Sequence, residues 1–364
     1  MSRRINLIGG TAYSSTGGIQ QMNRTLVQEL AQAGRLRRAF FLWDDAWTGM
    51  EEGRRMKAEG WVRLYDLARG AFLKDLLTQA LRYPSDFWIC THVNYAFLGI
   101  LVGLLRGKKV AVMLHAAELD DDVSWLKSWA LRRAGLMITV SEYTKRKALA
   151  LGVRPERVHI LHNGVADPCP EGPKSSSAAS APMVLFVGRM DERYKGQMEL
   201  LDAMVILRRR LPRLHLVFVG GGRSLDYWRR EAELRDLSGM VEFAGRVSEV
   251  DLRSAYERAA LFAMPSENEG FGLVYAEAMA HGLPCIGSDR DAAREVIVDG
   301  ATGYCVPAGN AVVLADAIQR VVDSPALRAN MGSAGRRRFE ENFTTAKYRE
   351  RLLDLMQSWT AVAA

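Results

Sequence analysis

Short apolar segments alternate with amphipathic, helix-like segments along almost the whole chain. In the first half the strand-like segments are residues 4–9, 39–43, 87–91, 109–114, 136–140 and 157–161. Between the first two, residues 19–30 carry apolar side chains at three- and four-residue steps, which is the spacing of one helix face. Continuous apolar strands separated by such helices are typical of parallel sheets covered on both faces. The alternation therefore predicts a doubly wound α/β architecture.

Residues 166–182 interrupt this alternation with four prolines, four serines and little apolar content, which is typical of a linker. Strand-like segments then resume at residues 183–188, 215–220, 241–245, 261–265 and 284–288. Two doubly wound domains facing a central cleft are expected, because ligands bind outside the carboxyl ends of such strands. The expected boundaries are an N-terminal domain over 1–167, a linker over 168–182, a second domain over 183–344, and a C-terminal helix over 345–364 that packs back toward the N-terminal domain.

The composition is that of a soluble globular protein, because 48% of the 364 residues are hydrophobic and 25% are charged. This excludes a largely disordered chain, a collagen-like fibre and a small disulfide scaffold. The four cysteines are widely spaced and form no CxxC pair, which argues against structural zinc and favours a reducing cytoplasm. No signal peptide is recognised before the first strand. The apolar run 95–105 is shorter than the roughly 20 residues of a membrane span, so a buried helix is expected.

The net charge of +7 lies entirely in the first half. Residues 1–170 contain 24 Lys and Arg against 16 Asp and Glu, whereas residues 171–364 contain 25 against 26. A basic half favours an acidic partner such as a membrane surface, a phosphate-bearing substrate or nucleic acid, and a solvated surface without a partner is the alternative. Residues 124–135 combine Trp125 and Trp129 with three basic residues. This segment fits either a membrane interface or a domain core.

Two loops that follow predicted strands have the character of phosphate sites. Residues 9–19 include Gly17 and Gly18 before a helix whose N-terminal N–H groups can meet an anion. The pattern is not GxGxxG, and glycine-rich first turns are common without a ligand. In residues 188–196, Arg189 and Lys195 precede a second helix, where two cations can neutralise a diphosphate. A solvated basic loop is the alternative for this second segment.

The most informative segment is residues 265–284, PSENEGFGLVYAEAMAHGLP. Glu269 lies in a glycine-flanked turn, and Glu277 lies eight residues later in the helix that follows. Carboxylates accept paired hydrogen bonds from vicinal hydroxyls, so a sugar and a ribose are suitable ligands for such a pair. A pair of surface glutamates is the alternative.

In these residues the chain resembles the retaining, nucleotide-sugar-dependent glycosyltransferases of family 4, which have the GT-B fold. The resemblance is carried by Gly17-Gly18, Val140-Ser141-Glu142, His162-Asn163-Gly164-Val165, residues 186–196 (FVGRMDERYKG), residues 219–222 (VGGG), the E-x7-E block of Glu269 and Glu277, and residues 299–306 (DGATGYCV). It covers most of the chain, and it is strongest in the second half.

The resemblance implies a role for each matching residue. Gly17 and Gly18 present backbone N–H groups to the donor phosphates, and Arg189 and Lys195 bind the leaving diphosphate. Glu269 holds sugar hydroxyls with help from the backbone of Gly270, Phe271 and Gly272. Glu277 binds the ribose, Arg246 and Val247 lie near the base, and His115 lies near the donor sugar. A histidine that ends a strand has a structural role as its alternative.

One segment departs from the family pattern and one candidate metal motif is weak. Residues 288–297 lack the glycine pair that members often carry near the donor sugar, although Glu295 matches their acidic residue. Asp120, Asp121 and Asp122 do not form an Asp-x-Asp metal motif in a suitable loop. No metal and no other cofactor is therefore expected, since cations and helix dipoles can stabilise the leaving diphosphate.

The resemblance implies a metal-independent hexosyltransferase that moves a hexose from a nucleotide-sugar to a glycan or lipid-diphosphate acceptor in exopolysaccharide or lipopolysaccharide assembly. GDP-mannose is the favoured donor, with UDP-linked sugars as alternatives. The expected location is the cytoplasm, with peripheral contact to the inner face of an anionic plasma membrane and no nucleic-acid partner. The alternative functions are a GT-B UDP-sugar epimerase and a non-catalytic nucleotide-sugar-binding scaffold. A dinucleotide oxidoreductase is disfavoured, because GxGxxG is absent.

Overall fold

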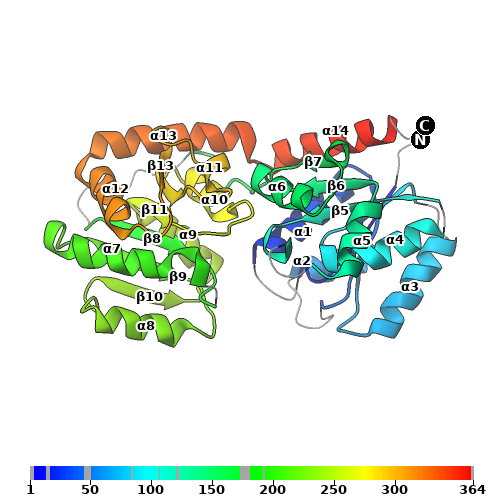
Figure 1. The fold of residues 1–364 in the computed structure, drawn as a ribbon, viewed down its shortest axis with the longest axis horizontal. Coiled ribbons are helices and arrows are strands. Elements are labelled where there is room, and N and C mark those ends of the chain that lie inside the picture. Colours follow the sequence, from blue (N-terminus) through cyan, green and yellow to red (C-terminus); the bar gives the residue numbers. More distant parts are fainter. Residues whose placement is uncertain are drawn as a thin grey trace. The chain divides into compact units, whose positions relative to one another are not determined.

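The structure is a computed structural model that describes residues 4–13, 17–44, 51–82, 85–105, 107–119, 123–172, 181–191 and 193–361. The chain divides into two compact units (Figure 1). Unit 1 comprises Met1–Gly164 and Thr345–Ala364, and unit 2 comprises Val165–Thr344. Each unit is an α/β layer built around one parallel sheet, as the alternation in the sequence predicts.

Unit 1 contains a seven-stranded parallel sheet in the order β3-β2-β1-β4-β5-β6-β7. Its strands are β1 (Ile5–Gly9), β2 (Leu36–Phe41), β3 (Val62–Leu64), β4 (Phe87–Cys90), β5 (Lys109–Leu114), β6 (Leu136–Thr139) and β7 (Val158–Ile160). Its helices are α1 (Gly18–Gln32), α2 (Glu51–Ala58), α3 (Arg69–Arg82), α4 (Ala96–Leu104), α5 (Trp125–Arg133), α6 (Glu142–Ala150) and α14 (Thr345–Ala361). Strands paired in this order form a doubly wound sheet.

Successive residues of the unit 1 strands enter two different hydrophobic clusters. Leu7 and Phe41 belong to the cluster that contains α1 and α14, whereas Ile8 and Phe40 belong to the cluster that contains α3 and α4. Side chains alternate between the two faces of a strand, so both faces of this sheet are buried. This burial explains why its strands read as continuous apolar runs rather than as alternating ones.

Helix α14 covers part of the unit 1 sheet although it lies at the far end of the sequence. Tyr348, Leu352, Met356 and Trp359 are buried in the same cluster as α1. The rings of Trp359 and Phe87 lie 4.9 Å apart between centroids. These contacts explain the apolar side chains of a helix that is separated by 180 residues from the rest of its unit.

Unit 2 contains a six-stranded parallel sheet in the order β10-β9-β8-β11-β12-β13. Its strands are β8 (Met183–Val187), β9 (His215–Val219), β10 (Val241–Gly245), β11 (Leu261–Met264), β12 (Cys285–Ser288) and β13 (Gly303–Val306). Its helices are α7 (Gln197–Arg210), α8 (Leu225–Leu234), α9 (Glu249–Arg258), α10 (Leu273–Ala280), α11 (Ala293–Val296), α12 (Ala311–Asp323) and α13 (Pro325–Asn342).

The structure differs from the sequence-based expectations in three places. Strands β3 and β13 are absent from the predicted set, because three or four residues are too few to give a distinct periodic signal. Strand β2 begins at Leu36, three residues before the predicted segment. The run 95–105 contains α4 and is buried only in part: Leu101, Leu104 and the following Leu105 are exposed, whereas the buried residues of the helix are Ala96, Gly99, Ile100, Val102 and Gly103.

In both sheets the strand order reverses beside the first strand of the unit. In unit 1 the reversal lies between β1 and β4, and in unit 2 it lies between β8 and β11. Crossover helices leave opposite faces of the sheet on the two sides of such a point, and this opens a crevice at the carboxyl ends of the strands. Residues that follow β1, β4, β8 and β11 are therefore the ones positioned to meet a ligand.

Candidate active site

In unit 2, the loops that follow β8 and β11 bring two of the predicted site residues into direct contact. Nζ of Lys195 lies 3.0 Å from Oε2 of Glu269, and the two side chains are 15% and 20% exposed. Lys195 precedes α7, and Glu269 lies in the turn before α10. A partly buried ion pair at the switch point of a sheet can exchange its internal partner for charged and hydroxyl groups of a ligand.

Two glycines set the backbone conformation where these loops enter α7 and α10. Gly196 has φ +86° at the N-cap of α7, and a Cβ there would lie 2.6 Å from the carbonyl oxygen of Pro265. Gly272 has φ +84° at the N-cap of α10, and a Cβ there would lie 2.3 Å from the Tyr275 ring. Glycine is therefore required by both backbone conformation and space at these two helix starts.

The turn that carries Glu269 is held by a buried carboxylate that the sequence analysis did not identify. Asp291 accepts hydrogen bonds from the Glu269 backbone N–H at 2.8 Å, from Ser266 Oγ at 2.6 Å and from the Ala293 N–H at 2.9 Å. Burial raises the pKa of Asp291 to about 6, although these hydrogen bonds act in the opposite direction. Asp291 is one of two aspartates in residues 288–297, and the sequence gives no signal of its role, because two of its partners are 22 and 25 residues away.

Glu277 is half-buried on α10 and accepts a hydrogen bond of 3.0 Å from the hydroxyl of Tyr256 on α9. Burial and the neighbouring Glu277 carboxylate raise the pKa of Tyr256 well above its ordinary value, so the hydroxyl stays protonated and donates. Tyr256 was also absent from the predicted site. This hydrogen bond fixes one oxygen of Glu277 and sets the direction in which the carboxylate can accept further hydrogen bonds.

The remaining predicted residues of unit 2 line the same carboxyl edge. Gly270 and Phe271 are buried in the Glu269 turn, where the Phe271 ring lies 5.6 Å from that of Phe343. Arg189 is exposed after β8, and its carbonyl oxygen accepts a hydrogen bond of 3.3 Å from Gln197. These positions keep the Arg189 side chain accessible to a ligand at the end of the strand.

Arg246 and Val247 follow β10, where Arg246 is exposed and Val247 is half-buried. A Cβ on Gly221 would lie 2.7 Å from Cγ of Arg246, so the VGGG segment after β9 lies directly beside Arg246.

Glu295 is half-buried on α11, and its carbonyl accepts a hydrogen bond of 2.6 Å from Arg338. The weak motif at Asp120, Asp121 and Asp122 lies outside the described residues.

In unit 1, Gly17 and Gly18 lie at the start of α1, as the sequence predicts. Gly17 is the N-cap, no side chain of the described residues caps this helix end, and its first turn contains no acidic residue. The loop between β1 and α1 is fastened by Asp44, which accepts hydrogen bonds from the backbone N–H groups of Ala12 at 2.7 Å and Tyr13 at 3.0 Å. Such a helix start offers N–H groups and a partial positive charge to an anion.

His115 directly follows β5, and its Nε2 lies 2.8 Å from the carbonyl oxygen of Thr91 at the end of β4. Its backbone N–H donates to the carboxylate of Glu118. The next residue, Ala116, has φ +97°, a conformation that L-residues rarely adopt and that concentrates at functional sites. His92 lies 6.2 Å from His115 between ring centroids, and burial lowers its pKa, so this second imidazole remains neutral.

Comparisons with known proteins agree with the architecture of both units. The family model for group 1 glycosyl transferases matches residues 171–338, and the model for glycosyltransferase family 4 matches residues 16–167. The HepE protein of Anabaena, solved in complex with UDP, has a TM-score of 0.80 at 18% identity and covers 98% of this chain and 100% of its own. The sucrose-phosphate synthase of Thermosynechococcus elongatus has a TM-score of 0.80 at 22% identity, covering 99% and 100%.

Two curated relatives are similar over most of their length. A GDP-mannose-dependent α-(1-6)-phosphatidylinositol monomannoside mannosyltransferase of Mycolicibacterium smegmatis is 27% identical, over 93% of this chain and 94% of the relative. A GDP-mannose-dependent enzyme of Corynebacterium glutamicum that acts on the monoacylated form is 32% identical, over 76% of this chain and 77% of the relative. Because this relative is 32% identical over most of the chain and family models match both units, the chain belongs to the nucleotide-sugar-dependent glycosyltransferases of family 4, which have the GT-B fold.

Proposed function

We propose that the chain is a retaining mannosyltransferase that moves mannose from GDP-mannose to the polar head group of a membrane glycolipid. The observation that carries the proposal is the contact of Lys195 and Glu269 at the switch point of the unit 2 sheet. The donor identity is supported by the two relatives above, whose names state a dependence on GDP-mannose. Their names also state a phosphatidylinositol monomannoside acceptor, which supports an acceptor of the phosphatidylinositol class.

The donor contacts follow from the chemistry of each side chain. Lys195 and the exposed Arg189 bind the diphosphate, the lysine as a point charge and the arginine through its planar fork. Once Lys195 turns toward the phosphates, Glu269 accepts hydrogen bonds from two hydroxyls of the mannose ring. Glu277, already oriented by Tyr256, accepts hydrogen bonds from the ribose hydroxyls. In unit 1, taken by itself, the N–H groups at Gly17 and Gly18 can likewise donate to an anion.

Charge development during transfer explains why these residues are cations and helix starts. Glycosyl transfer passes through an oxocarbenium-like state while negative charge grows on the leaving diphosphate. Preorganised positive groups stabilise that charge more in the transition state than in the ground state, which is how they lower the barrier. We infer that Arg189 and Lys195 meet this need without a metal ion. In unit 1, His115, which is held by the Thr91 carbonyl, is proposed as a sugar-binding residue.

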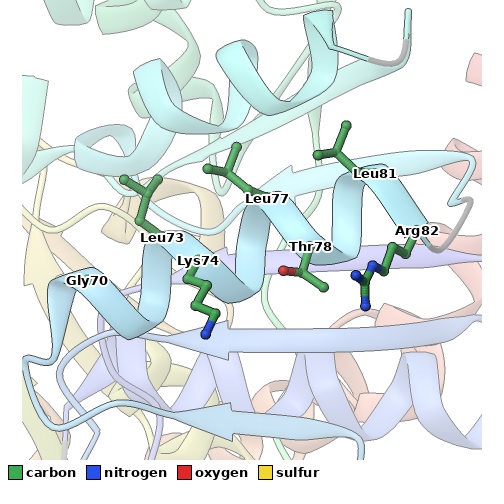
Figure 2. A pocket seen from close by; sticks show the side chains of 7 residues that line it. All are labelled: Gly70, Leu73, Lys74, Leu77, Thr78, Leu81 and Arg82. Atoms are coloured by element: carbon green, nitrogen blue, oxygen red, sulfur yellow. The ribbon is translucent and has the colours of Figure 1, made fainter.

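A membrane contact is proposed for unit 1, where apolar side chains are exposed on two helices that pack against each other, α3 and α4. On α3, Leu73, Leu77 and Leu81 are 43%, 37% and 58% exposed, and Figure 2 shows them on one side of the helix with Lys74 and Arg82 on another. The exposed leucines at the other helix are Leu101 and Leu104 on α4 and Leu105 directly after it. Leucines beside basic residues on a helical surface fit the interface of an anionic bilayer.

This surface differs from the segment that the sequence singled out. In α5, Trp125 is 76% exposed, but Leu131 is buried and the Trp129 ring packs 5.8 Å from that of Phe97 on α4. Most apolar side chains of helix α5 therefore pack against the core of unit 1. None of the helices in the described part of the chain is long and apolar enough to cross a membrane.

GDP is expected to raise the melting temperature of the protein more than UDP or ADP does. A ligand at 100 times its dissociation constant adds about 2.7 kcal/mol to the free energy of unfolding, which a thermal-shift assay detects readily. Glu277→Ala should abolish most of the shift, since it removes the ribose contact. Glu242→Ala is the matched control, because Glu242 is an exposed carboxylate on β10. A larger shift with UDP would contradict the GDP-mannose donor, and no shift with any of the three would contradict nucleotide-sugar binding.

Vesicles that contain phosphatidylinositol are expected to bind the protein at low salt and to release part of it as the salt concentration rises. Salt screens the attraction between the basic side chains of the protein and the anionic lipid head groups, and so weakens binding. The triple variant Leu77→Glu, Leu81→Glu, Leu104→Glu should stay in solution, whereas Leu234→Glu should still bind. Leu234 is a suitable control because it is 74% exposed on α8 of unit 2. Equal sedimentation of both variants with the vesicles would rule out the α3 and α4 surface.

A further inference from the structure

Three side chains of unit 2 that the transfer reaction does not use meet in one small cluster. They are Cys169, which lies between the start of the unit and β8, Glu257 near the end of α9, and His281 at the end of α10. One potential ligand atom from each lies within 4.8 Å of the others, and Sγ of Cys169 is 3.4 Å from Nδ1 of His281. Cys169 is 4% exposed and His281 is 7% exposed.

We propose that Cys169, Glu257 and His281 form a binding site for a zinc-class divalent metal ion. A thiolate, an imidazole and a carboxylate are the three ligand types that zinc binds in proteins. The separation between Sγ and Nδ1 is close to that of two ligands on a tetrahedral ion with bonds of about 2.0 to 2.3 Å. The spacing of cysteines in the sequence predicts no such site, because the three residues are 88 and 24 positions apart and only folding brings them together.

The charges around the cluster suit a dication once the thiol has lost its proton. Glu257 is paired with Arg253 at 2.9 Å, and Arg336 is paired with Asp167 at 2.6 Å and with Glu340 at 2.6 Å. Glu257 and Asp167 balance the two guanidinium groups that act on Cys169 and His281, so the Cys169 thiolate gives the cluster a net negative charge. The Glu257 side chain is 23% exposed, which provides a route for the ion and a position for a water ligand.

The metal would connect three segments that otherwise meet only through side-chain packing. His281 ends α10, and its ring stacks on Tyr256 of α9 with centroids 5.0 Å apart and planes inclined by 8°. Tyr256 in turn donates to Glu277 on α10. A bound ion therefore stabilises the α9 and α10 pair against separation, away from the phosphate-binding groups Arg189 and Lys195. Its role in this site is structural, and it takes no part in the transfer step.

The test is titration of the chelator-treated full chain with Zn²⁺ alone, followed by calorimetry, and with Co²⁺, followed by thiolate-to-metal absorption. The expected result is one bound equivalent, a thiolate absorption band and a higher melting temperature. Cys169→Ala should lose the band and the bound equivalent, and His281→Gln should lose the bound equivalent. Cys305→Ser, which removes a half-buried thiol on β13, should retain both. None of these readouts depends on the donor or the acceptor.

Two results would overturn the proposal. The first is the absence of a stoichiometric ion in the wild-type protein, which would leave Cys169 and His281 as a hydrogen-bonded pair only. The second is equal binding by Cys169→Ala and wild type, which would place the ion elsewhere. Removal of zinc by a chelator should lower the melting temperature while transfer activity persists well below that temperature.

Discussion

Lys195→Met is expected to lower kcat/KM for sugar transfer by about 10²- to 10³-fold, the usual effect of removing one preorganised group that stabilises developing charge. Methionine keeps the length of the aliphatic stem and removes only the charge. Nζ of Lys195 is 3.0 Å from Oε2 of Glu269, so the substitution also leaves that carboxylate without this cation. Steady-state kinetics and calorimetric titration with GDP measure the two consequences separately.

The matched control for this variant is Arg210→Met. Arg210 forms an ion pair of 2.6 Å with Asp316, but the two side chains are 39% and 58% exposed. Exposed ion pairs contribute about 0 to 1 kcal/mol, so this variant should keep both its stability and its turnover. Near-normal turnover and GDP affinity in Lys195→Met would remove Lys195 from the donor site. A loss of turnover in Arg210→Met as well would indicate a general effect of lowering the charge of unit 2.

Asp291→Asn is expected to lower kcat strongly and to reduce the free energy of unfolding by about 1 to 3 kcal/mol, the cost of a buried polar group left unsatisfied. Oδ2 accepts from Ser266 and from the Glu269 N–H, and Oδ1 accepts from the Ala293 N–H. An asparagine has a single acceptor oxygen. In either orientation its amide group faces a backbone N–H, so donor meets donor and the Glu269 turn shifts.

The split between kcat and GDP affinity tests whether Asp291 acts by positioning Glu269. Asp291 holds the turn that we assign to the sugar, whereas Lys195 and Glu277 are assigned to the nucleotide. The variant should therefore lose more in kcat than in affinity for GDP, measured by single-turnover kinetics and by calorimetry. Asp289→Asn is the control, because Asp289 is exposed and the hydrogen bond that it accepts from the Ala308 N–H is long, at 3.4 Å. Equal losses of kcat and GDP affinity would contradict the positioning role.

The raised pKa of Asp291 also predicts a pH dependence of stability. Its pKa is about 6 in the folded protein, above the unfolded value of about 3.9, so folding favours the protonated form. The resulting stabilisation is complete below about pH 4 and is lost as the pH rises through about 6. Denaturation of wild type and Asp291→Asn across this interval should therefore show the advantage of wild type shrinking as pH increases. An advantage that grows with pH would contradict the raised pKa.

Much of the architecture could be predicted from local patterns. Continuous apolar segments are recognisable because strands such as β1 and β5 are buried on both faces, and this burial favours apolar side chains. The short strands β3 and β13 were not predicted from the sequence. Each is an edge strand of three or four residues, and the formation of such a strand depends on pairing with its neighbour more than on its own sequence. The same limit applies to α4, whose uniformly apolar run does not reveal which of its leucines the rest of unit 1 covers.

The sequence by itself determined the family, the doubly wound class and the residues assigned to donor binding, because glycines at helix starts and charged residues after strands are local requirements of phosphate and hydroxyl recognition. Only the tertiary structure decided what holds those residues. Asp291 beneath the Glu269 turn, Tyr256 on Glu277, and the meeting of Cys169 with His281 all join residues at least 21 positions apart. Such contacts depend on the packing of whole helices and strands, so a local sequence pattern does not predict which distant residues will meet.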